Sequence, residues 1–313
     1  MLHEIEIAGL KLPTNVFLAP MAGYTNYPFR KICRELGAGL TFTEMVSCKG
    51  LAFGNEETKK LLYTEDDETP KAAQIFGSSP FIMRGACESD DLAPFDLIDI
   101  NMGCPMPKIV KNGDGNALME NPKLAEEIVK ECVKSGKRIS VKFRVGIKTG
   151  DVMAAEFAKM CEGAGACMIT VHGRTRDKIY SGPPDYAQIA AAKQAVKIPV
   201  IGNGGVWNPR DVRIMCERTG VDGVMIGRAA MYRPQVFAEI MEKEEPPMLG
   251  LFLQQLEKTQ EIYGERFACV FMRKMAAFYL KGRRHAASMK RALFAAESVG
   301  ELKALAETFF NME

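Results

Sequence analysis

Short apolar runs recur along the first 230 residues of the chain, and polar segments separate them. Each run has four or five residues and shows little alternation of apolar and polar positions. Such near-continuous runs are typical of strands that are buried on both faces, as in a parallel sheet covered by helices. The eight predicted strands are 16–19, 40–43, 72–76, 97–100, 139–143, 167–171, 198–201 and 223–226.

Most of the segments between these strands carry the start signals of a helix. Asn121-Pro122 and Asn208-Pro209 each place a capping residue before a proline, which suits the first helical position. Eight βα units between residue 16 and about residue 242 predict an α/β fold, a (β/α)8 TIM barrel. A doubly wound open sheet uses the same units, but it usually has fewer strands, and its G-x-G-x-x-G turn after the first strand is missing here.

The two ends of the chain predict smaller parts. Residues 1–12 read as a hairpin that could close the N-terminal end of the barrel. A polar hinge over 243–247 ends in two prolines, and residues 248–313 show helical periodicity with few breakers. We therefore expect a barrel domain over residues 1–242 and a small all-helical C-terminal domain over residues 243–313.

Composition narrows the class of protein but not its partner. Of the 313 residues 47% are apolar, and 41 Lys and Arg against 39 Asp and Glu leave a net charge of +2. The nine cysteines form no Cys-x-x-Cys pair, which favours a reducing cytoplasm, and three distant histidines make a metal site improbable. The acidic residues close to Met1 do not suit a signal peptide, and no apolar run in the sequence reaches the length of a membrane span, so we expect a protein that is neither exported nor membrane-spanning. We expect a cytoplasmic monomer without a metal.

The exits of the last two predicted strands indicate a phosphate site. In a TIM barrel, functional residues follow the C-terminal ends of the strands. The seventh strand runs into Asn203-Gly204-Gly205 and the eighth into Gly227-Arg228. One Gly-Gly pair alone would indicate only a tight turn. Two neighbouring loops with accessible backbone N–H groups, together with an arginine, favour a bound phosphate.

Three further side chains suit a flavin. Lys142 lies inside the fifth predicted strand, where a lysine needs an anionic partner because an uncompensated buried charge is costly. A flavin ring supplies that partner, since a cation beside N1 and O2 stabilises its reduced, anionic form. Gln74 can meet the pyrimidine-like edge of the ring with one donor and one acceptor. His172, at the exit of the sixth strand, is expected to contact the cofactor.

Cys104 is the sharpest chemical signal. It lies between Gly103 and Pro105 after the fourth predicted strand, and a polar segment with two glycines follows at 108–116. The other eight cysteines are interpreted as small core residues. As a protonated thiol Cys104 can act as a general acid. As a thiolate it would be a nucleophile, which is the weaker interpretation because the only nearby bases are lysines and His172.

From end to end, the chain resembles the tRNA-dihydrouridine synthase family. The resemblance rests on motifs that occur in the family's order. These are 19–30, which begins Ala19-Pro20-Met21-Ala22-Gly23, then 74–77, 99–105, 141–144, 171–175, 202–205 and 226–228.

The resemblance implies an FMN-binding barrel followed by a helical tRNA-binding domain, with NADPH as the reductant. Hydride from flavin N5 would reach uracil C6, and Cys104 would protonate C5. Asn101 and Arg174 would contact the substrate. The residues implied to hold FMN are Pro20, Met21, Ala22, Gln74, Lys142, His172, Asn203, Gly204, Gly205, Gly227 and Arg228.

Two other functions stay open: a small-molecule flavin oxidoreductase of the dihydroorotate dehydrogenase or old-yellow-enzyme kind, and a tRNA-binding or folding factor with a secondary flavin. The segment 266–291 favours a tRNA enzyme over a small-molecule oxidoreductase, because it holds eight basic residues and no acidic one. A solvated helix face usually mixes both signs, so this segment indicates contacts with an RNA backbone, for which Arg283 and Arg284 are candidates. The target uridine would be flipped out of its stack to enter the barrel.

Overall fold

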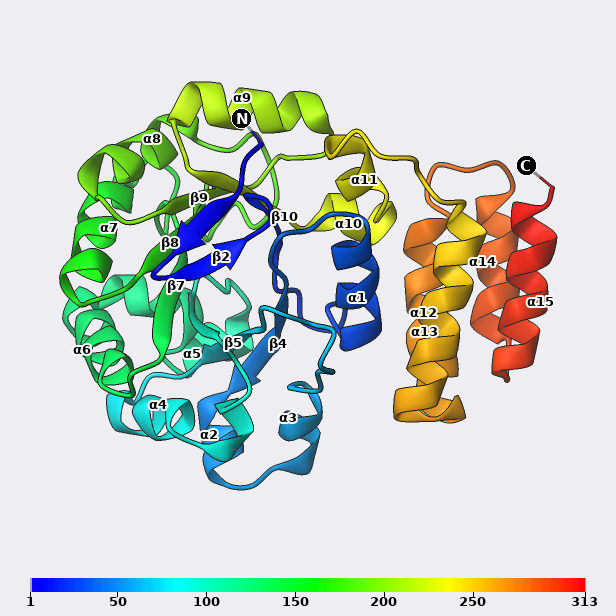
Figure 1. Cartoon of the computed structure of the whole chain (residues 1–313), viewed down its shortest axis with the longest axis horizontal. Helices are drawn as coiled ribbons and strands as arrows, with labels where there is room; N and C mark the ends of the chain where they lie inside the picture. Colours follow the sequence, from blue (N-terminus) through cyan, green and yellow to red (C-terminus); the bar gives the residue numbers. More distant parts are fainter. Residues whose placement is uncertain (1, 313) are drawn as a thin grey trace.

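The computed structural model describes residues 2–312 and contains a closed parallel barrel with helices packed at its side (Figure 1). The strands pair in the order β3-β10-β9-β8-β7-β6-β5-β4. The two edge strands meet where Phe17 bridges Leu40, and the Leu18 N–H donates to the Leu40 carbonyl at 2.9 Å. The predicted TIM barrel is therefore confirmed. Its strands are β3 (Val16–Leu18), β4 (Phe42–Ser47), β5 (Ala72–Phe76), β6 (Leu97–Met102), β7 (Arg138–Arg144), β8 (Met168–His172), β9 (Val200–Asn203) and β10 (Gly223–Ile226).

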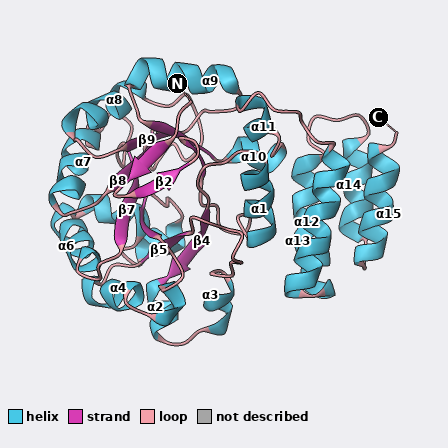
Figure 2. Cartoon of the chain, in the orientation of Figure 1, coloured by secondary structure: helices cyan, strands magenta, loops and turns pink. Residues whose placement is uncertain are grey.

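Helices surround the barrel (Figure 2). Two of them begin at the caps that the sequence predicts. The side chains of Asn121 and Asn208 each accept a hydrogen bond from a backbone N–H three residues on, and a proline follows each cap. The barrel helices are α1 (Tyr27–Glu35), α2 (Cys48–Ala52), α3 (Glu56–Lys60), α4 (Pro80–Cys87), α5 (Pro107–Lys111), α6 (Pro122–Val133), α7 (Ala154–Gly163), α8 (Tyr186–Ala195), α9 (Pro209–Thr219), α10 (Arg228–Tyr232) and α11 (Val236–Ile240). Two short 3-10 helices are Asp90–Leu92 and Gly115–Glu120.

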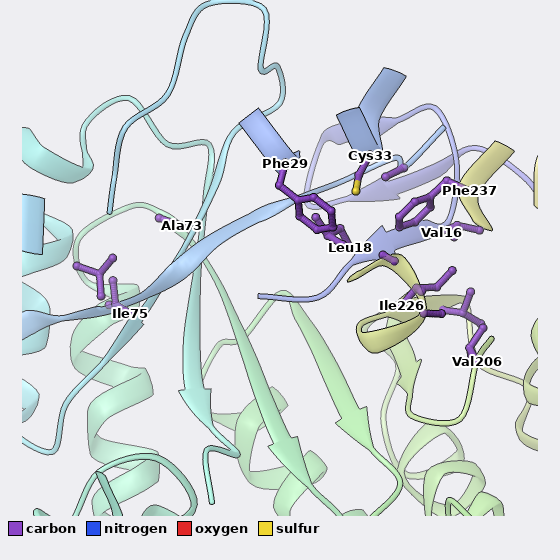
Figure 3. Packing of buried hydrophobic residues seen from close by; sticks show 14 of the residues in the cluster. Val16, Leu18, Phe29, Cys33, Ala73, Ile75, Val206, Ile226 and Phe237 are labelled. Carbon is purple, nitrogen blue, oxygen red and sulfur yellow. The ribbon is translucent and has the colours of Figure 1, made fainter. Parts of the chain in front are cut away.

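Apolar side chains fill two regions. Between the sheet and the helices, Phe29 and Cys33 of α1 pack with Leu18 and with Phe237 of α11 (Figure 3). A second cluster lies inside the barrel, where the predicted hairpin, β1 (Ile5–Ile7) paired with β2 (Leu10–Leu12), contributes buried side chains. The hairpin therefore closes the N-terminal end of the barrel and leaves chemistry to the opposite end.

Four helices follow the barrel and pack against one side of it (Figure 1). They are α12 (Met248–Tyr263), α13 (Glu265–Tyr279), α14 (Ala286–Ala295) and α15 (Val299–Phe310). Helix α12 contacts α1, and α13 contacts α10. The segment 241–247 joins them to α11 and includes the domain boundary that the sequence predicts. No helix within residues 2–312 is long and apolar enough to cross a membrane.

Candidate active site

A cavity of about 660 Å³ opens at the C-terminal ends of the barrel strands. Asn101, Cys104 and every residue that the sequence assigns to FMN line it. Arg174, Arg283 and Arg284 do not line it, and no acidic side chain is found among its described lining residues. The barrel thus brings most of the predicted site residues into one space.

A chain of hydrogen bonds connects Cys104 to the barrel interior. The backbone N–H of Cys104 donates to Asn101 Oδ1 at 2.9 Å, and Asn101 Nδ2 donates to Gln74 Oε1 at 2.9 Å. Gln74 Nε2 in turn donates to Asp99 Oδ2 at 2.7 Å, and the Ser140 hydroxyl donates to the other oxygen of Asp99 at 2.6 Å. Every donor in the chain points toward the carboxylate, so the bonds polarise one another in the same direction.

This chain fixes the orientation of two amides that the sequence assigns to ligands. Gln74 uses one donor and one acceptor inside the protein, so it can offer a ligand only its second N–H and second lone pair. Asp99, which fixes the amide of Gln74, was not predicted as a site residue. Its signal was an acidic residue inside an apolar strand. Burial raises the pKa of Asp99 to about 6.

Asn203 orients two further predicted residues. Its Oδ1 accepts from Lys142 Nζ at 3.1 Å and lies 2.7 Å from His172 Nδ1. Burial, together with the charges of Lys142 and Arg144, holds the pKa of His172 well below its usual range, so the ring is neutral. Since Asn203 Oδ1 can only accept, Nδ1 carries the proton. The buried Nε2 atom, which has no partner, then presents a lone pair.

Burial and neighbouring charges also set the protonation of Lys142. Burial and the nearby Arg144 lower the pKa of Lys142 to about 8, whereas the Asp99 carboxylate opposes this fall. The amine is therefore mostly cationic at neutral pH. A cation in a buried position suits a ligand that develops negative charge beside it.

The loop after β9 lines the cavity with two glycines whose missing side chains would meet neighbouring protein atoms. Gly204 and Gly205 have φ values of +108° and +75°, which favour glycine. A Cβ atom on Gly204 would lie 3.1 Å from Arg174 Nη1 and 3.4 Å from His172 Cε1. Arg174 is buried, its Nε donates to the Gly182 carbonyl at 2.9 Å, and its Nη1 has no hydrogen-bond partner. Arg174 thus lies beside the glycine loop rather than in the cavity wall.

Arg144, which was not predicted as a site residue, holds two loops of the site together. Its Nε donates to the Gly103 carbonyl at 2.8 Å, next to Cys104. Its Nη1 donates to the carbonyl oxygens of Thr175 at 3.2 Å and Ile179 at 2.9 Å, in the loop after β8. The sequence feature that could have indicated this role is a second basic residue in the strand that carries Lys142.

Cys104 is half-buried in the cavity wall. Burial raises the pKa of the Cys104 thiol above its ordinary value, even though Arg144 and Lys142 act in the opposite direction. The thiol is therefore protonated at neutral pH. This state suits an acid and does not suit a nucleophile, which needs a lowered pKa or an adjacent base.

Helix α13 reaches the loop that follows β3. Lys274 donates to the Gly23 carbonyl, and the Gly23 N–H donates to the Glu44 carboxylate. The Lys274 amine also lies 4.3 Å from the centroid of the Tyr24 ring. Lys274 belongs to the basic segment predicted to contact RNA, but its partners lie within the protein. Arg284, in the loop between α13 and α14, is exposed.

Comparison with known proteins identifies the family. Residues 17–312 match the family model described as dihydrouridine synthase (Dus). The chain belongs to the dihydrouridine synthase family. Membership confirms the resemblance seen in the motifs, and it makes the chain an oxidoreductase, because forming dihydrouridine adds hydrogen to a double bond.

Relatives with this family name cover nearly all of the chain. tRNA-dihydrouridine synthase B of Pseudomonas aeruginosa is 36% identical over 287 residues, which are 88% of this chain and 86% of that protein. The protein of the same name from Pasteurella multocida is 33% identical and covers 98% of this chain and 96% of its own length. The solved structure of morphinone reductase has a similar fold, with a TM-score of 0.58 at 13% identity, covering 78% of this chain and 90% of that one.

Proposed function

We propose that this protein is a tRNA-dihydrouridine synthase that reduces the C5–C6 double bond of a uridine in tRNA, with FMN as cofactor and NADPH as reductant. One observation carries the proposal. A protonated thiol, Cys104, faces a cavity whose other walls hold the Lys142 cation and the glycine loop at Gly204. The names of the relatives agree with this substrate.

The residues present fit FMN. FMN has one phosphate and one ring that becomes anionic on reduction. Its site therefore needs a backbone cradle for the phosphate and, apart from the cradle, a cation beside the ring. The loop of Gly204 and Gly205 supplies the cradle, and Lys142 supplies the cation. Arg174 lies behind this loop, outside the cavity lining, and its substrate contact stays a prediction. The remaining FMN contacts in this proposal are Pro20, Met21, Ala22, Gln74, His172, Asn203, Gly227 and Arg228.

When bound and reduced by NADPH, FMN supplies the hydride that adds to uracil C6. Cys104 supplies the proton: its S–H bond breaks as a C–H bond forms at C5, which completes a two-electron reduction. The nearby charges of Arg144 and Lys142 stabilise the thiolate that results, and solvent returns its proton. The second N–H of Asn101 makes only a long contact to Met45 Sδ, at 3.9 Å, which a uracil oxygen can replace as the acceptor.

The C-terminal helices, residues 243–313 in this proposal, contact the tRNA backbone. Arg283 and Arg284 lie in the loop between α13 and α14, at the end of the bundle. Arg284 is exposed there, whereas Arg283 is half-buried beside the Phe310 ring, and an exposed basic side chain suits a phosphate. The exposed basic residues of this segment are Arg266, Lys281, Arg284 and Arg291.

The test uses two components. One is the purified protein loaded with FMN, and the other is tRNA isolated from cells that lack this protein. Wild-type protein should form dihydrouridine, detected by mass spectrometry, with consumption of NADPH. Cys104→Ala should retain FMN and its reduction by NADPH, whereas dihydrouridine formation should fall by roughly 10²- to 10⁴-fold. Cys216→Ala, on α9 outside the cavity lining, is the matched control and should keep full activity. Equal rates for Cys104→Ala and wild type would exclude the acid role.

A further inference from the structure

Three aromatic side chains from separate elements form what we call the aromatic shelf: Trp207, Tyr232 and Phe278. Trp207 follows β9, Tyr232 ends α10 and Phe278 belongs to α13. The Trp207 and Tyr232 rings are stacked, with centroids 5.9 Å apart and an interplanar angle of 19°. The rings of Tyr232 and Phe278 lie 5.4 Å apart. All three side chains line the cavity, yet the proposed chemistry uses none of them.

Two cations lie over the aromatic shelf. The Lys281 amine is 4.1 Å from the centroid of Tyr232, and the Arg228 guanidinium is 5.4 Å from that of Trp207. Lys281 is exposed, so its charge is available to a phosphate outside the cavity. Arg228 connects the shelf with the proposed cofactor cradle. Aromatic faces with adjacent cations are the combination that binds unpaired nucleotides.

The position of the shelf suits one class of ligand. Trp207 is 42% exposed, although it borders the cavity, stacks with Tyr232 and lies under the Arg228 guanidinium. If a uridine occupies the cavity, the nucleotide joined to it must lie just outside, at the mouth. Trp207 both lines the cavity and is partly exposed, and none of the described residues lining the cavity is acidic. The Asp211 carboxylate, outside that lining, accepts from the Trp207 backbone N–H at 2.9 Å.

We propose that the aromatic shelf stacks with the base of an unpaired nucleotide adjacent to the target uridine. This inference rests on the proposed function, since it requires an RNA substrate. The stacking replaces part of the energy lost when the uridine leaves its own stack. It also holds the strand in register, while Lys281 attracts the phosphate beside the stacked base.

The experiment pairs protein variants with altered RNA. FMN-loaded wild type, Trp207→Leu and Trp207→Phe are assayed for binding and reduction of synthetic tRNA, with and without an abasic site at each nucleotide flanking the target. Trp207→Leu should weaken tRNA binding and raise KM by about 5- to 100-fold, with a much smaller change in kcat. Trp207→Phe, which keeps an aromatic face, should retain most of the affinity. Phe81→Leu, a highly exposed aromatic of α4 outside the cavity lining, should behave as wild type.

The combined changes decide the proposal. One flanking abasic site should weaken binding to the wild type but cause no further loss in Trp207→Leu, because both changes remove the same stack. If the abasic site and Trp207→Leu each weakened tRNA binding by the same factor alone and in combination, the proposed role of the aromatic shelf would be wrong. A raised KM for NADPH with unchanged tRNA affinity would overturn it too, and would assign Trp207 to the reductant. Wild-type protein that neither binds nor reduces tRNA would overturn the proposed function itself, and the shelf with it.

Discussion

The side chain of Asn101 holds the backbone of Cys104. Its Oδ1 atom accepts hydrogen bonds from the N–H groups of Gly103 at 3.1 Å and of Cys104 at 2.9 Å. Its Nδ2 atom is bonded to Gln74, so the amide cannot turn over without breaking the chain that ends at Asp99. The position of the proposed acid therefore depends on a polar network inside the barrel.

Replacing Asn101 should separate positioning from cofactor binding. We expect Asn101→Ala to retain FMN but to lower kcat for tRNA reduction by about 10- to 100-fold, because the Cys104 loop loses its anchor and a small displacement of an acid is costly. Asn121→Ala is the matched control. It removes the cap of α6, which should cost about 1 kcal/mol of stability without an effect on kcat. Steady-state kinetics with equal FMN content check this, and an unchanged kcat in Asn101→Ala would contradict it.

A methyl group on Gly204 should block the anion cradle. In Gly204→Ala the new Cβ meets Arg174 and His172, so we expect FMN affinity to fall by at least about tenfold. Gly150→Ala is the closer match in backbone strain, at φ +97° against +108° for Gly204, and nothing lies within 4 Å of its Cβ. Both variants should lose about 1 kcal/mol of stability, measured by thermal unfolding without FMN. Equal FMN affinities in the two variants would refute the cradle.

Lys142 predicts how cofactor binding depends on pH. The pKa of about 8 means that the cation is present below pH 8 and is lost as pH rises through that value. We therefore expect the affinity for reduced FMN to fall above about pH 8, by at most tenfold per pH unit, since one proton is involved. Asp99→Asn removes a charge that favours the cation, so the fall should begin at lower pH. Lys142→Gln should bind reduced FMN weakly and show no such fall in anaerobic titrations followed by absorbance.

Lys274 couples the C-terminal helices to the loop after β3, which carries the proposed FMN contacts Pro20, Met21 and Ala22. We expect Lys274→Ala to release FMN more readily, with a Kd raised by about tenfold, because a charge-assisted hydrogen bond to Gly23 is lost. Truncation before residue 246 removes Lys274 as well, so it should also weaken the binding of FMN. Lys290→Ala on α14 is the control and should leave the cofactor in place. Equal FMN retention by Lys274→Ala and wild type after extensive dialysis would argue that α13 does not support the loop.

The proposed RNA contact of Arg284 can be tested through the salt dependence of tRNA binding. If this exposed side chain contacts a tRNA phosphate, Arg284→Ala should weaken binding similarly for different tRNAs. The slope of log affinity against log salt should become shallower by about one unit. Adding Arg283→Ala should extend both effects. Binding measured by anisotropy at several salt concentrations gives the slope, and an identical slope would return Arg284 to the role of an ordinary surface residue.

The sequence by itself determined the barrel and most of the cavity lining. The eight strands were readable because strands buried on both faces must be apolar throughout, and the asparagine caps mark helix starts through bonds only three residues long. Once the strands were placed, their exits had to meet at one end of the barrel, so Cys104, Lys142 and Gly204 could be predicted to lie together.

Only the tertiary structure decided which atoms meet. Lys274 and Gly23 are 251 residues apart, and their contact depends on how α13 packs against the barrel, which no local pattern encodes. In the same way, the sequence marked Arg174 as polar and near the site, but not that its Nη1 would lie beside Gly204 without a partner. Periodicity reports whether a side chain is buried. Its partner is set by barrel closure and helix packing, because these bring together residues that are far apart in the chain.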